Sequence, residues 1–319
     1  MERTLKKTLP AQIIVLFVLT TVVLAPLPVR PQEKKTEIEH EISVSAISIA
    51  VTVQGKDGRY ISDLTQDDFT VYENETKQTI TYFKHDFEAP VSLTVLLDVS
   101  GSMGLQDKLR ESIEALRYLL TGLLRPQDEA SLLIFADGQV EVAAKFSTDK
   151  AVFLAELDHT EAYGQTALND AVAVSPEFAN RGKNEKRAIL LITDGIENDS
   201  QASVDQAVEI ARRVDVPIFT IGYKIPLSEE LLRRYKRTSA LTSAGIVSSL
   251  ERFSQATGGR VFIAAQQPEL MAALREIERE LSQQYIIGYT SYKNVKNEYR
   301  KIRVEAAEKK YKVRTREGY

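Results

Sequence analysis

Two largely apolar segments place the tightest constraint on the fold. VSLTVLL spans residues 91–97, and AILLIT spans residues 188–193. AILLIT is a continuous apolar run, which is typical of a strand in a sheet that is covered on both faces. A chain of 319 residues, of which 43% are hydrophobic, is long enough to bury such a sheet.

Helical patterns alternate with these strands along the middle of the chain. Apolar residues recur at helical spacing from Leu109 to Leu123, and again from Leu270 to Leu281. This alternation predicts an α/β fold with a doubly wound, mostly parallel sheet. The other elements that we expect are strands at 131–136, 139–146, 216–222 and 260–264, a helix at 203–214, and a helix that carries Ile246, Leu250 and Phe253.

The two flanks of this block show strand patterns instead. Apolar and polar residues alternate over 47–54, and DFTVYEN (68–74) and TITYF (79–83) are separated by an Asn-Glu turn. Further strands are expected at 284–290, 301–307 and 310–316. We therefore expect residues 45–85 and 285–316 to pair in one small accessory β-sandwich.

The last of these segments is basic. Residues 293–316 hold ten basic and three acidic side chains. A solvated strand face explains this charge, and a polyanion-binding face is the alternative.

The N-terminus has the form of an export signal. Arg3, Lys6 and Lys7 precede the apolar run from Ile13 to Ala25. Small residues favour cleavage after Ala25, whereas Pro26 disfavours it, so residues 11–29 could instead stay as a membrane anchor. We expect an exported protein, either secreted or located in the periplasm or cell envelope. The predicted organisation is a signal peptide or anchor at 1–25, a linker at 26–38, an N-terminal β segment at 39–89, an α/β domain at 90–283 and a C-terminal β segment at 284–319.

Composition excludes several classes of function. The chain has 41 basic and 45 acidic side chains, a net charge of −4, so no chain-wide positive field favours nucleic acid. It has no cysteine, which excludes disulfides, thiolate metal sites and a cysteine nucleophile.

Oxygen-bearing side chains lie at two predicted strand ends and at one predicted helix start. The stretch LLDVSGSMG (96–104) carries Asp98, Ser100 and Ser102, Thr166 precedes a predicted helix, and Asp194 follows AILLIT. Ligands of open α/β sheets bind beyond the carboxyl ends of the strands, where we expect these side chains to meet. Carboxylates and hydroxyls without imidazole or sulfur favour Mg²⁺, Mn²⁺ or Ca²⁺. The sequence therefore predicts a metal site at Asp98, Ser100, Ser102, Thr166 and Asp194.

Each element of this site has a simpler explanation when it is taken alone. Aspartate, serine and threonine are common in turns and as helix caps. We expect the nearby acids to be ordinary surface residues: Asp137, Asp170, Glu197 and Asp199.

Enzyme chemistry is disfavoured by the same stretch. A nucleophile elbow needs glycine two positions before the serine, where Asp98 stands before Ser100. The only histidines are His40, His85 and His159, and none follows Asp194 as that triad order requires. No phosphate-binding loop of the form G-x-x-x-x-G-K-[ST] is present.

DVSGS at 98–102, Thr166 in GQTAL and Asp194 in TDG together resemble the metal-ion-dependent adhesion site of the von Willebrand factor type A (VWFA) domain. The resemblance covers roughly residues 90–283 and implies a Rossmann-like fold. DLTQDDFTVYEN and the terminal strands resemble exported bacterial proteins with a VWFA-related region. By this resemblance, Ser100, Ser102 and Thr166 would reach the metal directly, and Asp98 and Asp194 would act through water or bind it directly.

The resulting hypothesis is a non-enzymatic binding module. The cation would bind an Asp or Glu side chain of a protein partner, because hydroxyl ligands leave its charge poorly compensated. The alternative is a scaffold subunit of a cell-envelope complex, in which the ion is mainly structural. The irregular segment 224–244 is either a partner-contact loop or a tolerated insertion.

Overall fold

The computed structural model describes residues 43–85, 87–226, 243–293, 298–308 and 310–319. The predicted signal peptide or anchor, the linker, His40 and most of the segment 224–244 lie outside the described residues. Within the described ranges, no helix combines the length and the apolar character needed to cross a membrane.

The α/β body contains a six-stranded sheet with the order β10-β9-β8-β5-β6-β7. All neighbours are parallel except β7, which runs antiparallel to β6. The prediction of a doubly wound, mostly parallel sheet is confirmed. The strands are β5 (Val91–Asp98), β6 (Glu129–Ala136), β7 (Gln139–Ser147), β8 (Lys186–Thr193), β9 (Ile218–Tyr223) and β10 (Val261–Ala264).

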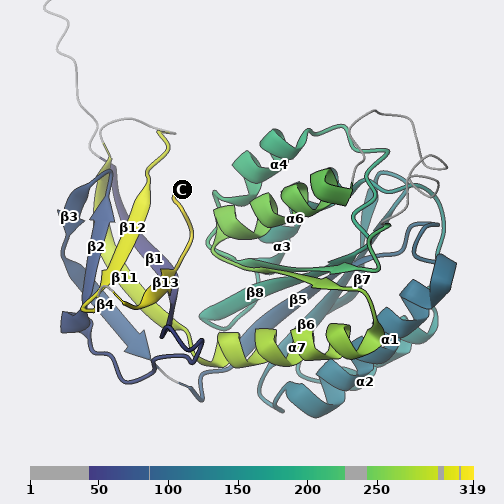
Figure 1. Cartoon of the computed structure of the whole chain (residues 1–319), viewed down its shortest axis with the longest axis horizontal. Coiled ribbons are helices and arrows are strands. Elements are labelled where there is room, and N and C mark those ends of the chain that lie inside the picture. The colour runs from purple at the N-terminus through teal and green to yellow at the C-terminus, as the bar shows by residue number, and fades with distance from the viewer. Residues whose placement is uncertain (1–42, 86, 227–242, 294–297, 309) are drawn as a thin grey trace, which may run out of the picture. The chain divides into compact units, whose positions relative to one another are not determined.

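Helices cover both faces of this sheet, as Figure 1 shows. One hydrophobic core joins the sheet to α1 (Lys108–Tyr118), α2 (Lys150–Asp158) and α7 (Gln267–Ser282). A second core on the opposite face joins it to α3 (Leu168–Ala179), α4 (Val204–Ala211) and α6 (Ser243–Thr257). The two apolar runs are buried along their whole length, as expected for strands covered on both faces.

Local signals set where several helices begin and end. Ser203 and Gln206 form a capping box at the start of α4. The sequence patterns do not predict α2, which begins where the Asp149 carboxylate accepts a hydrogen bond from the Ala151 amide. A 3₁₀ turn (Leu105–Asp107) leads into α1, and a π turn (Leu119–Leu123) ends it.

The flanks form two further sheets, with the orders β13-β1-β11-β4 and β12-β2-β3. Strands from both ends of the described chain pair with each other, since β1 lies antiparallel to β11 and β2 lies antiparallel to β12. Their inward side chains share one hydrophobic core, which confirms the predicted accessory β-sandwich. The strands are β1 (Ser43–Gln54), β2 (Phe69–Glu73), β3 (Thr76–Gln78), β4 (Ile80–His85), β11 (Tyr285–Lys293), β12 (Ile302–Ala306) and β13 (Lys312–Arg314), and a 3₁₀ turn (Gln66–Asp68) precedes β2.

The predicted Asn-Glu turn connects β2 to β3. Asn74 and Glu75 both have positive φ angles, 45° and 60°, as a two-residue hairpin turn requires.

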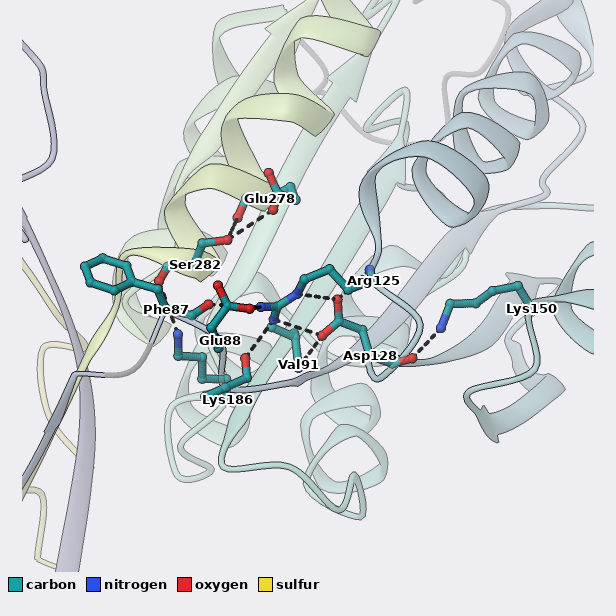
Figure 2. Close-up of polar contacts among 10 residues, drawn as sticks. Phe87, Glu88, Val91, Arg125, Asp128, Lys150, Lys186, Glu278 and Ser282 are labelled. Carbon is teal, nitrogen blue, oxygen red and sulfur yellow. Dashed lines mark hydrogen bonds and ion pairs between the residues drawn. The ribbon is translucent and has the colours of Figure 1, made fainter.

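A polar cluster fixes the beginning of β5, and Figure 2 shows its contacts. The Arg125 guanidinium donates to the Asp128 carboxylate (3.1 Å) and to the backbone carbonyls of Phe87 (3.0 Å) and Ala89 (2.8 Å). The Asp128 carboxylate also accepts a hydrogen bond from the Val91 amide (2.8 Å). We call Arg125, Asp128 and the backbone groups that they bind the Arg125–Asp128 cluster.

Candidate metal site

The predicted site lies at the point of the sheet where the chain switches from adding strands on one side to adding them on the other. The chain continues from β5 to β6 on one side and later adds β8 on the other side, so β5 lies between two parallel neighbours. Asp98 is the last residue of β5, and Asp194 directly follows β8. Open α/β sheets bind their ligands at such a switch point.

The loop after β5 holds three of the predicted residues in a compact turn. The Asp98 carboxylate accepts hydrogen bonds from the Ser100 amide (2.9 Å) and the Thr193 hydroxyl (2.6 Å). The hydroxyl oxygens of Ser100 and Ser102 are 3.2 Å apart. Both serines and Asp98 are buried, and the fully buried Met103 anchors the loop in the core beneath them.

Backbone hydrogen bonds join this loop to the loop that carries Thr166. The Gly101 amide donates to the Gly164 carbonyl (3.0 Å), and the Tyr163 amide donates to the Val99 carbonyl (2.8 Å). The Thr166 amide donates in turn to the Asn198 side chain (2.8 Å), in the loop after β8. The structure therefore brings the three predicted loops together.

Gly164 allows the close approach on which this arrangement depends. Its φ angle is +66°, and a β-carbon built on it would lie 2.1 Å from the Asp137 carboxylate. That carboxylate accepts a hydrogen bond from the Gln165 amide (2.6 Å), next to Thr166.

Three of the four nearby acids do more than the predicted surface role. Asp137 holds the Thr166 loop, and the Asp170 carboxylate accepts hydrogen bonds from the amides of Gln201 and Ala202. The Glu197 carboxylate accepts hydrogen bonds from the Asn169 amide and the Ser200 hydroxyl. These acids shape the loops around the site, and Asp199 stays exposed.

The sequence patterns did not assign Lys108 to the site. Its ammonium donates to the Asp194 carboxylate at 2.7 Å and to the Ser102 carbonyl at 3.3 Å. The Lys108 side chain is only 5% exposed, and the Asp194 side chain is fully buried. Helical spacing could have indicated that Lys108 is buried. Lys108, Ser112 and Leu116 are four residues apart and therefore lie on the same, buried face of α1.

The site carries more negative than positive charge. Asp98 and Asp194 are both buried, and Lys108 forms its ion pair with Asp194. Burial, and next the charge of Asp194, raise the pKa of Asp98 to about 7, although hydrogen bonds from Thr193 and Ser100 act in the opposite direction. An additional cation would relieve this repulsion.

The chemistry of the donor set fits a hard divalent cation. Hydroxyl and carboxylate oxygens are present, and the Lys108 ammonium shows that positive charge is stabilised here. The described part of the chain has no group of three or more His, Cys, Asp or Glu side chains suited to a metal. Any cation bound here would therefore depend on the hydroxyls of Ser100, Ser102 and Thr166.

Comparison with known proteins places this segment in a family. Residues 93–197 match the family model described as von Willebrand factor type A domain, and this range includes all five predicted site residues. An uncharacterised protein of Borreliella burgdorferi is 27% identical over 183 residues, which cover 54% of this chain and 53% of that protein. The mouse collagen alpha-1(VI) chain is 27% identical over 162 residues, which cover 46% of this chain and 16% of the collagen chain. The chain thus spans about half or less of these relatives.

A solved structure shares the fold. The pilus adhesin SpaC of Lactobacillus rhamnosus GG superposes with a TM-score of 0.50 at 12% identity, over 67% of this chain and 34% of SpaC. The family match over residues 93–197 and the order of the central sheet together identify this segment of the chain as a von Willebrand factor type A (VWFA) domain.

Proposed function

We propose that this protein is a non-enzymatic, metal-dependent binding module. Asp98, Ser100, Ser102, Thr166 and Asp194 would hold the cation, which is Mg²⁺ or, in its place, Mn²⁺ or Ca²⁺. When bound, the cation would supply an open coordination position for the carboxylate of an Asp or Glu on a protein partner. VWFA domains are commonly protein-interaction or adhesion modules.

One observation carries this proposal. Two hydroxyl oxygens 3.2 Å apart, on Ser100 and Ser102, accompany two buried carboxylates at the switch point of the sheet, and only one of these carboxylates is paired with an ammonium. A purely structural turn has no need for two buried acids side by side, because each charge is costly to remove from water.

The described histidines do not favour an enzyme. His85 lies on β4 in the accessory sandwich, where its ring stacks on Tyr285, and His159 follows the last turn of α2. Neither belongs to the three loops of the site. This arrangement supports a cation-binding site over a nucleophile with its base.

Calorimetric titration of the full chain with Mg²⁺, Mn²⁺ and Ca²⁺ tests the metal site. The double variant Ser100→Ala, Ser102→Ala should abolish cation binding that the unaltered protein shows. Ser112→Ala is the matched control, because Ser112 is also fully buried near the site but its hydroxyl has no hydrogen-bond partner among the described residues. Equal binding by the double variant and the control would refute the assignment.

The same double variant separates the binding module from the scaffold alternative. Proteins captured from a cell-envelope extract in Mg²⁺ and released by a chelator should no longer be captured by the double variant. A double variant that still captures them, but melts at a lower temperature, would favour the scaffold with a structural ion.

A further inference from the structure

Lys108 occupies a position that a lysine normally avoids. It is the first residue of α1, where the positive end of the helix dipole disfavours a cation. Gln106 and Asp107, directly before it, both have left-handed φ angles of 55° and 59°. The chain thus turns sharply to begin the helix with a buried lysine, although an exposed position for that ammonium would cost less.

The electrostatic compensation for this burial comes from the metal site itself. The only ion pair recorded for Lys108 in the described chain is with Asp194, at 2.7 Å. Its second acceptor is the backbone carbonyl of Ser102, one of the predicted ligand residues. Lys108 therefore contacts two of the five residues that the proposed function assigns to the cation.

We propose that Lys108 is a built-in competitor of the metal: its ammonium holds Asp194, and the divalent cation must share or displace it. This inference rests on the proposed function and concerns the regulation of the same site. Two positive groups that share one carboxylate repel each other, so Lys108 weakens the affinity of the protein for the cation.

The same ammonium has a second effect, on the partner. With Lys108 present, a divalent cation and two carboxylates leave a formal charge of +1, whereas without it the charge is zero. A site with surplus positive charge attracts an outside carboxylate more strongly. Lys108 thus lowers the affinity of the site for the metal and raises its affinity for an acidic group of the partner.

Metal titration of charge variants tests the competition. Lys108→Met should bind Mg²⁺ and Mn²⁺ about tenfold or more tightly than the unaltered chain, because a unit charge is removed close to the cation. Lys108→Arg keeps the charge and should stay close to the unaltered affinity. Lys224→Met is the control, since it removes a nearby ammonium that is paired with Glu111 (2.6 Å) and does not contact a site residue; its affinity should stay within about twofold.

The outcomes distinguish this inference from the proposed function. Cation binding by the unaltered protein with equal or weaker binding by Lys108→Met overturns the role of Lys108 and leaves the metal site intact. Absence of binding by the unaltered protein and every variant overturns both. Should Lys108→Met not fold, Lys108→Gln keeps a hydrogen-bond donor toward Asp194 without the charge, and the same tightening is expected.

Discussion

The two ends of strand β5 carry two polar clusters of opposite character. At the Val91 end, Arg125 is paired with the buried Asp128 and with the exposed Glu88, and the Arg125–Asp128 cluster binds the surrounding backbone groups (Figure 2). At the Asp98 end, two acids are buried and Asp194 is paired with the ammonium of Lys108. The first cluster is closed within the chain, whereas the second is left with negative charge that an outside cation can compensate. The comparison separates a cluster that stabilises the fold from one that is suited to bind.

Breaking the closed cluster should have the largest effect. Asp128→Ala leaves Arg125 with only the exposed Glu88 as its acid and the Val91 amide without its acceptor, so the free energy of unfolding should fall by about 3 kcal/mol or more. Chemical denaturation measures this loss. Asp158→Ala breaks an exposed ion pair with Arg117 and should change little; a similarly small change for Asp128→Ala would remove the contrast between the two ends.

Added metal should stabilise the folded protein only through the cluster at the Asp98 end of β5. Mg²⁺ at one hundred times its dissociation constant should raise the free energy of unfolding by about 2.7 kcal/mol. Thermal unfolding with Mg²⁺ and with a chelator measures the difference. The Ser100→Ala, Ser102→Ala double variant should show no such shift, and Asp128→Ala should keep it if the two ends act independently.

Neutralising one acid at the open end should act in the opposite direction to Asp128→Ala. In chelator, Asp98→Asn should raise the free energy of unfolding by about 1 kcal/mol, because burial and the charge of Asp194 disfavour the Asp98 carboxylate. The variant should also lose cation binding. Asp194→Asn should instead destabilise the protein, because it leaves the buried Lys108 ammonium without its acid. Denaturation curves in chelator that show both variants destabilised would contradict this account.

The smallest effect is expected at the loop that carries Thr166. Asp137→Ala removes the acceptor of the Gln165 amide and should weaken cation binding by about threefold through the position of Thr166 alone. Metal titration measures this change. Asp199→Ala removes an exposed acid of the neighbouring loop and serves as the control.

Most of the fold could be predicted because the spacing of apolar residues along the chain indicates each strand and helix. The continuous apolar run of β8 indicates a strand buried on both faces, and the alternation in β1 indicates a strand with one buried face. The convergence of Asp98, Thr166 and Asp194 follows from the rule that parallel strands end at one edge of the sheet. Short elements such as α2 and β3 carry too few residues for a period to emerge.

Pairings across long distances could not be predicted in the same way. Lys108 and Asp194 lie 86 positions apart, and Arg125 reaches carbonyls at Phe87 and Ala89. A charged side chain at a helix start or in a loop is usually solvated. Lys108 lies on the same face of α1 as the buried Ser112 and Leu116, but the local pattern does not show that its partner is Asp194. Such contacts depend on the assembled sheet and not on neighbouring residues.

The junctions of the α/β body with the accessory sandwich have a mechanical consequence. The chain leaves the sandwich after β4 and returns at β11, and these strands are antiparallel neighbours in which His85 and Tyr285 are register partners. Neighbouring strands lie about 5 Å apart. A pull applied between the two flanks is therefore carried by the paired strands of the sandwich, and the α/β body with its binding loops lies outside the load path.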